Sequence, residues 1–445
     1  MAVAKRRRGG AAILSFPRPT RTAPPSHRML IHRWPNGLQL VAVHAPQLAT
    51  ASVSVFVRVG SAHERPADNG ISHVVEHMVF KGSATRDAAR INLDAERLGA
   101  EVNAHTDKDH TAYHLRGRPE DAARFVHLLA DLLRAPTFPA DELERERQVL
   151  LQEMAEVDDD PMALAYQLFD RGCYGAHPAG QPVIGTRRNL QRFTRDELQR
   201  WVARHHVGAG LVVAAMGPLD PQALAREVEA ALAGLAPGEA SATALPAWQG
   251  DVRTRRFPGS SQAHVVLGYP LPPLGQDDAR AEMAALLFGE GMSSPLMAEL
   301  RERRGLAYYA ACAADRFVHG GQFMVEVSCA SEQAVQALGE TRRLLAQQAQ
   351  AIDAIDLERA RHQMTVRLLR RQESAMRALE PLALELMAGL TPVTPAERLA
   401  QAHAVDAESL RTLFEAMLHA PPALAITGQV PRGARERATA LLEAA

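Results

Sequence analysis

The sequence is poor in cysteine, in long apolar runs and in net charge. Its 445 residues contain three cysteines, Cys173, Cys312 and Cys329, which are too few and too scattered for a disulfide framework and lack zinc-finger spacing. No apolar run approaches the roughly 18 residues of a membrane-spanning helix. The net charge of −1 gives no bulk electrostatic reason to bind nucleic acid or a membrane surface. These absences leave an ordinary globular composition, with a length that suits roughly two to four domains.

Acidic residues are missing from the first 30 positions, whereas lysine and arginine are frequent there. An Arg-rich, acid-poor segment is typical of organelle transit peptides, but the prolines at positions 17, 19, 24 and 25 interrupt any amphipathic helix. We therefore predict that residues 1–28 form a basic, disordered tail, with a transit peptide as the alternative. The expected compartment is the cytoplasm, and the periplasm and the mitochondrial matrix stay open.

Short apolar strands alternate with amphipathic helices from about residue 29 onward. A polar stretch at 236–250 contains Gly, Ala and Pro and is typical of a linker. After it a similar order of elements recurs, with a strand at Ala423–Thr427 and long helices at 331–351 and 353–372. This repetition predicts an α+β fold with two homologous domains, 29–235 and 251–445, each a mostly antiparallel sheet packed with helices.

The segment His73-Val74-Val75-Glu76-His77 is the most informative part of the chain. On a helix, residues four apart share a face, so His73 and His77 can bind one zinc ion. Glu76 would then lie beside the metal and could take a proton from a zinc-activated water. The order H-x-x-E-H is the inverse of the commoner zinc motif. The alternative for these five residues alone is a surface helix with two solvated histidines.

A third metal ligand has to come from elsewhere in the chain, since catalytic zinc usually has three protein ligands. Residues 139–158 are predicted to form a long helix with one stripe of mostly acidic residues, namely Glu142, Glu146, Val149, Glu153 and Glu156. A solvated helix face explains such a stripe equally well. Spacing alone does not choose which glutamate binds the metal.

Residues 99–115 are predicted to form a strand, a polar turn and a second strand. An ordinary hairpin is one interpretation of this stretch. The functional one is an edge strand that binds an extended peptide main chain to main chain.

Further along the chain, a predicted helix that carries Arg301 ends at Gly305 and is followed by a strand with Tyr308. On the sequence pattern alone, this is a helix end with a solvated charge run.

Together these segments resemble the pitrilysin/insulinase family of zinc peptidases over roughly residues 30–430. The resemblance is greatest to the half-length members, the mitochondrial processing peptidase group and its bacterial relatives. In that family the third ligand lies about 76 residues after the second histidine, in a segment of the form E-R-E-R-x-V-h-h-x-E. Residues 144–153 fit this form, and Glu153 is its last residue.

The resemblance implies a role for each remaining candidate residue. It implies Glu153 as the third zinc ligand and Glu146 as a carboxylate that supports the ligands from outside. Asn103 and Ala104 are implied to hold the substrate backbone. Arg301 and Tyr308 are implied to contact the bound peptide and its tetrahedral intermediate, where an Arg and a phenolic O–H can stabilise an oxyanion.

The sequence as a whole predicts a zinc endopeptidase with one Zn²⁺ per chain. We expect it to cleave peptides or unfolded segments in an enclosed chamber, with Glu76 as general base. The family implies domains arranged as the halves of a clamshell, and a homodimer or a heterodimer with a related chain. Two alternatives are a non-catalytic partner subunit, which would be expected to lose site residues, and a zinc hydrolase for a non-peptide substrate.

Overall fold

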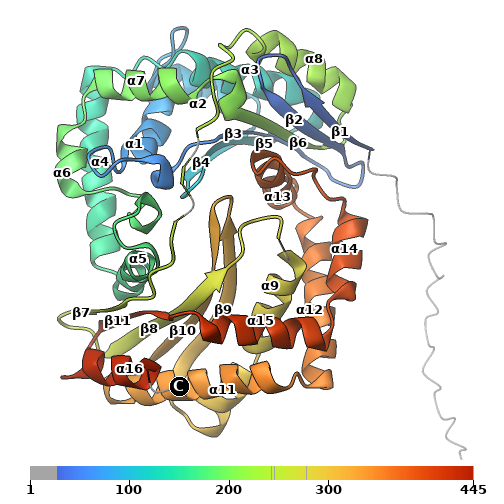
Figure 1. The fold of residues 1–445 in the computed structure, drawn as a ribbon. Coiled ribbons are helices and arrows are strands. Elements are labelled where there is room, and N and C mark those ends of the chain that lie inside the picture. Colours follow the sequence, from blue (N-terminus) through green and yellow to red (C-terminus); the bar gives the residue numbers. More distant parts are fainter. Residues whose placement is uncertain (1–27, 242, 245, 277, 444–445) are drawn as a thin grey trace, which may run out of the picture.

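The computed structural model describes residues 28–241, 243–244, 246–276 and 278–443. The basic tail predicted for residues 1–28 therefore lies, apart from Arg28, outside the described residues. Figure 1 shows two sheets, one at each end of the molecule, with helices around them. Within the described ranges, no helix has both the length and the apolar character needed to cross a membrane.

The first sheet has six strands in the order β1-β2-β6-β3-β5-β4. Only β2 and β6 pair in parallel; the other neighbours are antiparallel. Strands β3 and β6 are buried along their whole length, so they lie in the centre of the sheet. The strands are β1 (Arg28–Arg33), β2 (Gln39–His44), β3 (Ala51–Val57), β4 (Glu101–Thr106), β5 (Thr111–Gly117) and β6 (Leu211–Gly217).

Eight helices belong to the first half of the chain as the structure describes it. Several begin with a side-chain cap that satisfies free N–H groups: Asp87 caps α2, Asp160 caps α5 and Thr194 caps α7. The helices are α1 (Ile71–Met78), α2 (Ala88–Arg97), α3 (Ala122–Arg134), α4 (Ala140–Asp158), α5 (Pro161–Tyr174), α6 (Arg187–Arg192), α7 (Arg195–His205) and α8 (Pro221–Leu232).

The second sheet repeats the topology of the first. Its order is β7-β11-β8-β10-β9, and again one pair, β7 and β11, is parallel while the other neighbours are antiparallel. In chain order, β7 to β11 correspond one by one to β2 to β6. The strands are β7 (Val252–Arg256), β8 (Gln262–Leu271), β9 (Ala307–Phe317), β10 (Gly320–Ala330) and β11 (Ala423–Gly428).

Helices connect the strands of the second half in the same order as in the first. A π-helical turn, Ala298–Arg303, follows the short helix α10 and ends before Gly305. The helices are α9 (Asp278–Gly289), α10 (Pro295–Met297), α11 (Ala334–Gln350), α12 (Ala354–Arg371), α13 (Ala375–Met387), α14 (Pro395–Ala404), α15 (Ala407–His419) and α16 (Ala434–Glu443). The mixed α+β fold with two mostly antiparallel sheets confirms the predicted fold class.

Two equivalent helices are exchanged between the halves. Helix α13 packs on the first sheet, where Leu379 and Leu382 join a core cluster with Phe56 and Val212. Helix α5 packs on the second sheet, and its Phe169 lies in a cluster that includes Val266. Figure 1 shows α13 next to the first sheet and α5 beside β8 and β11. The two halves are thereby joined by buried apolar contacts in both directions.

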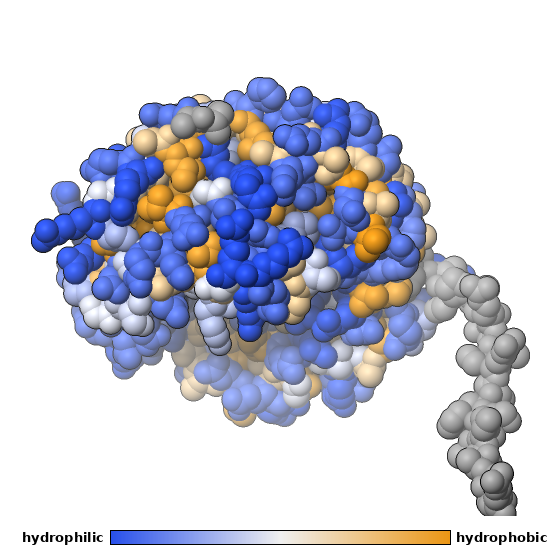
Figure 2. Space-filling view, turned by 90° about the horizontal axis from the view of Figure 1, so that it is seen from below, coloured by the Kyte–Doolittle hydropathy of each residue, from blue (hydrophilic) through white to orange (hydrophobic). Residues whose placement is uncertain are grey.

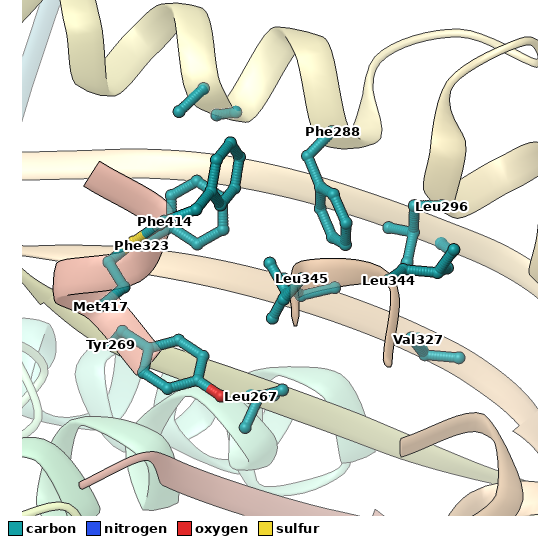
Figure 3. Close-up of a cluster of buried hydrophobic side chains, with 14 of the residues drawn as sticks. Leu267, Tyr269, Phe288, Leu296, Phe323, Val327, Leu344, Leu345, Phe414 and Met417 are labelled. Atoms are coloured by element: carbon teal, nitrogen blue, oxygen red, sulfur yellow. The ribbon is translucent and has the colours of Figure 1, made fainter. Parts of the chain in front are cut away.

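The second half also has a core of its own, formed where α9, α11 and α15 cover the outer face of its sheet (Figure 3). Phe288, Phe323 and Phe414 meet there with ring centroids 5.9–6.4 Å apart. Such edge and tilted contacts are the preferred geometry for aromatic pairs. Figure 2 shows the outer surface from this end of the molecule, where hydrophobic residues form small groups between hydrophilic ones.

Candidate metal centre

Helix α1, which carries the two histidines, begins with an unusual cap. Gly70 has a left-handed φ of 98° and no side chain to cap the helix. The buried carboxylate of Glu64 instead accepts hydrogen bonds from the backbone N–H groups of Gly70 at 2.7 Å and Ser72 at 2.9 Å. A negative charge at a helix N-terminus is favourable because the free N–H groups lie there. Glu64 thereby fixes the start of the helix and the direction of its histidines.

His73, His77 and Glu153 meet between α1 and α4. Nε2 of His73 lies 3.7 Å from Oε1 of Glu153, and Nε2 of His77 lies 3.7 Å from Oε2 of the same carboxylate. The imidazole rings of the two histidines are 4.7 Å apart at their centroids. The two nitrogen–oxygen separations are each shorter than two zinc–ligand bonds of roughly 2.0–2.2 Å, and the three ligand atoms lie within 4.8 Å of one another, so one ion can reach all three side chains.

Glu146 holds His77 from the side away from Glu153. One carboxylate oxygen of Glu146 accepts a hydrogen bond from Nδ1 of His77 at 2.8 Å, and the other pairs with Nζ of Lys81 at 2.6 Å. Because Nδ1 carries the proton, the lone pair of Nε2 is free to bind a metal. Carboxylates that fix the tautomer of a ligand histidine in this way are general features of metal sites.

The charges of the cluster suit a cation. Burial lowers the pKa of His73 to about 3, and the neighbouring His77 adds to the effect, so His73 is neutral and able to bind a metal. Burial also lowers the pKa of His77, but Glu146 and the nearby Glu76 and Glu153 outweigh it and raise the pKa overall. Two imidazoles and a carboxylate are a common ligand set of catalytic zinc. The described residues therefore fit the metal that the sequence predicts.

Glu76 lies on the same helix, directly before His77. Its Oε2 accepts a hydrogen bond of 2.6 Å from the hydroxyl of Thr106, at the end of β4. Burial raises the pKa of the Glu76 carboxyl, although Thr106 and His77 act in the opposite direction. A carboxyl with a raised pKa beside a metal site is suited to accept and return a proton.

Asn103 and Ala104 lie in β4, which is the edge strand of the first sheet. Ala104 pairs with Tyr113 of β5 on one side, and the side-chain oxygen of Asn103 accepts a hydrogen bond from the Ala104 N–H at 2.9 Å. Thr106, in the same strand, contacts Glu76. The open edge of the strand therefore runs toward the cluster of His73, His77 and Glu153.

Arg301 and Tyr308 lie together in the second half. The guanidinium carbon of Arg301 is 5.8 Å from the centroid of the Tyr308 ring, and Tyr308 is 74% exposed. Arg301 also contacts Met292 and Glu302, and both contacts are local. Within the described residues, neither side chain contacts the His73, His77 and Glu153 cluster.

Three supporting residues had no assigned role in the sequence-based prediction: Glu64, Lys81 and Thr106. Glu64 and Thr106 act through hydrogen bonds to α1, but Glu64 precedes the helix and Thr106 lies in β4, so neither belongs to the helical pattern that identifies the motif. Lys81 is four positions after His77, and residues with this spacing lie on the same side of a helix. The spacing could therefore have indicated Lys81 as a charge partner for Glu146.

The fold and the cluster define a duplicated α+β chain with a His-His-Glu centre in its first half. Residues 39–187 match the family model of insulinase, peptidase family M16, and residues 192–364 match that of the peptidase M16 inactive domain. The chain belongs to the insulinase family, peptidase family M16.

Curated relatives carry names that agree with this membership. A protein of Mycobacterium tuberculosis named an uncharacterized zinc protease is 34% identical over 70% of this chain and 72% of its own length. A Bacillus subtilis protein named in the same way is 30% identical over 76% of this chain and 83% of its own length. These names support a metallopeptidase.

Solved structures share the fold at lower identity. A structure from Pseudomonas fluorescens, described as a peptidase M16 inactive domain, superposes with a TM-score of 0.84 at 22% identity, over 91% of this chain and 98% of the other. A protease from Helicobacter pylori superposes with a TM-score of 0.82 at 21% identity, over 90% and 99%. At these identities the likeness concerns the fold.

Proposed function

We propose that the chain is a zinc-dependent endopeptidase that cleaves peptides or unfolded protein segments. The observation that carries the proposal is the meeting of His73, His77 and Glu153 around one point, with the Glu76 carboxyl beside them. The three ligand atoms lie within 4.8 Å of one another. A zinc ion bound there would supply Lewis-acid polarisation of the scissile carbonyl and acidify a water molecule.

The chain's own residues would then do the following. Glu76 takes the proton of the attacking water on its carboxylate and later gives it to the leaving amine, a task that its raised pKa favours. Thr106 holds the Glu76 oxygen in place through its 2.6 Å hydrogen bond. Asn103 and Ala104 on the open edge of β4 bind the substrate backbone as an added strand, which selects extended peptides over folded ones.

Arg301 and Tyr308 complete the site from a second chain in this proposal. They lie together on the surface of the second half, where Tyr308 is 74% exposed. In a pair of chains closed around a chamber, this Arg and Tyr of one chain serve the metal cluster of the other. An Arg donor and a phenolic O–H can stabilise the developing oxyanion. The partner is a second copy or a related chain.

The first test is cleavage of an unstructured, quenched-fluorescent peptide. Wild type should cleave it in a chelator-sensitive manner, and Glu76→Gln should retain zinc but lose about 10²–10⁴-fold in kcat. Glu156→Gln is the matched control, because Glu156 lies on the exposed side of α4 near Glu153. Unchanged activity in zinc-loaded Glu76→Gln would show that the base is another group.

The second test addresses the pairing of chains. Arg301→Ala and Glu76→Gln should each be inactive, and a mixed dimer of the two should recover activity, since one of its two sites then has every group intact. Verified mixed dimers without any recovery would contradict the exchange of Arg301 and Tyr308 between chains.

A further inference from the structure

A second group of potential metal ligands lies where the β4–β5 hairpin meets helix α13. Nε2 of His105 is 3.1 Å from Nε2 of His110 and 3.8 Å from Oε1 of Glu380. The three ligand atoms lie within 4.8 Å of one another. As in the first cluster, each of these separations is shorter than two metal–ligand bonds of roughly 2.0–2.2 Å.

The outer nitrogens of both histidines are already held by partners. Nδ1 of His110 donates to a carboxylate oxygen of Asp109 at 2.8 Å, and the other oxygen of Asp109 accepts from the Val318 N–H at 2.7 Å. Nδ1 of His105 is 3.1 Å from Nε2 of His114, whose Nδ1 is 2.7 Å from the Ser54 hydroxyl. Both Nε2 atoms therefore point to the same space, with the outer support that ligand histidines usually have.

The protons of this chain of groups can be placed in two ways. In neutral His110, donation from Nδ1 to Asp109 leaves Nε2 with a lone pair. Without a metal, His105 donates from Nε2 to His110, His114 donates to His105, and Ser54 donates to His114. With a metal on both Nε2 atoms, His105 donates to His114 and His114 donates to Ser54. Metal binding replaces the His105–His110 hydrogen bond with two metal–nitrogen bonds and keeps the other hydrogen bonds, so it leaves no nitrogen of these three histidines without a partner.

We propose that His105, His110 and Glu380 form a second divalent-metal site, separate from His73, His77 and Glu153. Two imidazoles and one carboxylate suit Zn²⁺, Co²⁺, Ni²⁺ or Cu²⁺ rather than Mg²⁺ or Ca²⁺, which prefer oxygen ligands. His110 is buried, whereas Glu380 is partly exposed and lines a cavity of about 880 Å³, through which an ion can enter.

An ion bound at this site would join residues from the two halves of the chain. His105 and His110 come from the first half, and Glu380 comes from α13 of the second half. Metal binding there would tie the edge-strand hairpin to the second half of the chain. Because a ligand that binds only the folded state stabilises it, the bound ion should raise the melting temperature.

The test uses the full chain, stripped of metal and then titrated with Co²⁺ or Zn²⁺ alone. Elemental analysis after equilibrium dialysis should give two ions per chain for wild type and one for His105→Ala/Glu380→Gln. The exposed pair His127 and Glu227, 2.9 Å apart, supplies the matched control: His127→Ala/Glu227→Gln should keep two ions.

Thermal unfolding separates this site from the first one. In His77→Ala/Glu153→Gln, which disables the first cluster, added metal should still raise the melting temperature. Adding Glu380→Gln should remove that rise, and Glu373→Gln, an exposed change near the start of α13, should leave it. A single ion in wild type, or a second ion that survives His105→Ala/Glu380→Gln, would overturn the proposal. Glu380→Gln alone, a change at a partly exposed position, decides the matter if the double variant does not fold.

Discussion

The two halves of the chain have the same topology and very different interiors at one place. In both, a helix follows the central strand and precedes the edge strand: α1 in the first half and α9 in the second. Helix α1 carries the buried His73 and Glu76 and the partly buried His77. The buried positions of α9 hold apolar residues, including Met283, Leu287 and Phe288. The comparison indicates that the same fold accommodates either titratable or apolar side chains on this helix. The proposed chemistry therefore depends on a few side chains.

The helices that pack against α1 and α9 differ in the same way, with a charged residue buried in the first half and apolar residues in the second. Helix α4 buries the carboxylate of Glu146, whereas its counterpart α12 buries Leu357, Ala360, Met364 and Leu368. Buried charges destabilise a fold unless they are paired. Glu146 meets this condition because it pairs with His77 and Lys81, so the first half holds a paired carboxylate where the second half holds apolar side chains.

The largest expected effect tests whether the exchanged helices join the halves. Phe169 on α5 is 0% exposed, and its ring packs against Gly268 of β8, where a Cβ atom would lie only 2.4 Å from the ring. Phe169→Ala should lower the free energy of unfolding by about 3–5 kcal/mol. Hydrogen exchange should show the loss of protection in β8 and β11, although Phe169 belongs to the first half of the sequence.

The control for this change is Leu369→Ala on α12, because Leu369 is 57% exposed. It should change stability by no more than about 0.5 kcal/mol. If Phe169→Ala weakened only the first sheet, the exchange would not couple the halves.

Acid should affect the first half more than the second. Burial lowers the pKa of His206 to about 4, against an ordinary value of 6.5. The unfolded chain therefore binds a proton that the folded chain rejects, and stability falls as the pH drops from 6.5 toward 4. This one residue accounts for roughly 3 kcal/mol over that range.

His206→Asn keeps a donor for the carbonyl of Leu133, which His206 contacts at 3.0 Å, and removes the titration. Urea unfolding at pH 7.5 and pH 4.5 should show a smaller acid loss in this variant than in wild type. His419→Asn, at an exposed position of the second half, should follow wild type. If wild type and His206→Asn lost the same stability between pH 7.5 and pH 4.5, the acid loss would not come from protonation of His206.

Much of the architecture follows from the sequence, and the exceptions have a physical cause. The long helices near 331–351 and 353–372 and the strand near 423 were predicted and agree with α11, α12 and β11. Helices α13 to α15 were not predicted. Helix α13 contains Pro381, a residue that usually interrupts helices, and it packs on the sheet of the other half. The sequence of its apolar side does not indicate which sheet it covers.

For the site, the spacing of His73, Glu76 and His77 predicted a shared helix face, and the structure has all three on α1. The choice of Glu153 among the glutamates of α4 came from family resemblance, because a helix stripe does not tell which member faces another helix. Thr106 could not be found from local patterns, since its contact with Glu76 joins residues 30 positions apart, and Glu64 precedes the helix that it caps and so lies outside the helical pattern.

A smaller effect concerns Glu146, the buried carboxylate that α12 lacks. Glu146→Gln removes the charge that pairs with Lys81 and weakens the hold on His77. Zinc affinity should fall by about 10–100-fold. Competition with a chromogenic chelator measures this affinity, and Glu144→Gln, at an exposed position on the same helix, is the control. Unchanged affinity would mean that Glu146 does not support the ligand.

The smallest effect concerns how the two equivalent helices begin. Helix α12 is capped by Asp353, whose side chain accepts from the N–H groups of Ile355 and Asp356, whereas α4 begins after Pro139 without a side-chain cap. Asp353→Ala should cost about 0.5–2 kcal/mol of stability, measured by urea unfolding. Peptidase activity should be unchanged because, in the part of the chain that the structure describes, Asp353 caps its own helix and contacts neither the His73, His77 and Glu153 cluster nor Arg301 and Tyr308. A loss of activity without a loss of stability would contradict this division of roles.

The most direct measurement is anomalous diffraction at the zinc edge from crystals of zinc-loaded Glu76→Gln grown with an unstructured peptide. The account predicts a strong peak bounded by His73, His77 and Glu153, no equivalent peak between α9 and α12, and peptide density that extends the first sheet at β4. Absence of zinc from the first cluster, or a peptide bound away from β4, would contradict the assignment of the metal and the substrate-binding strand to the first half.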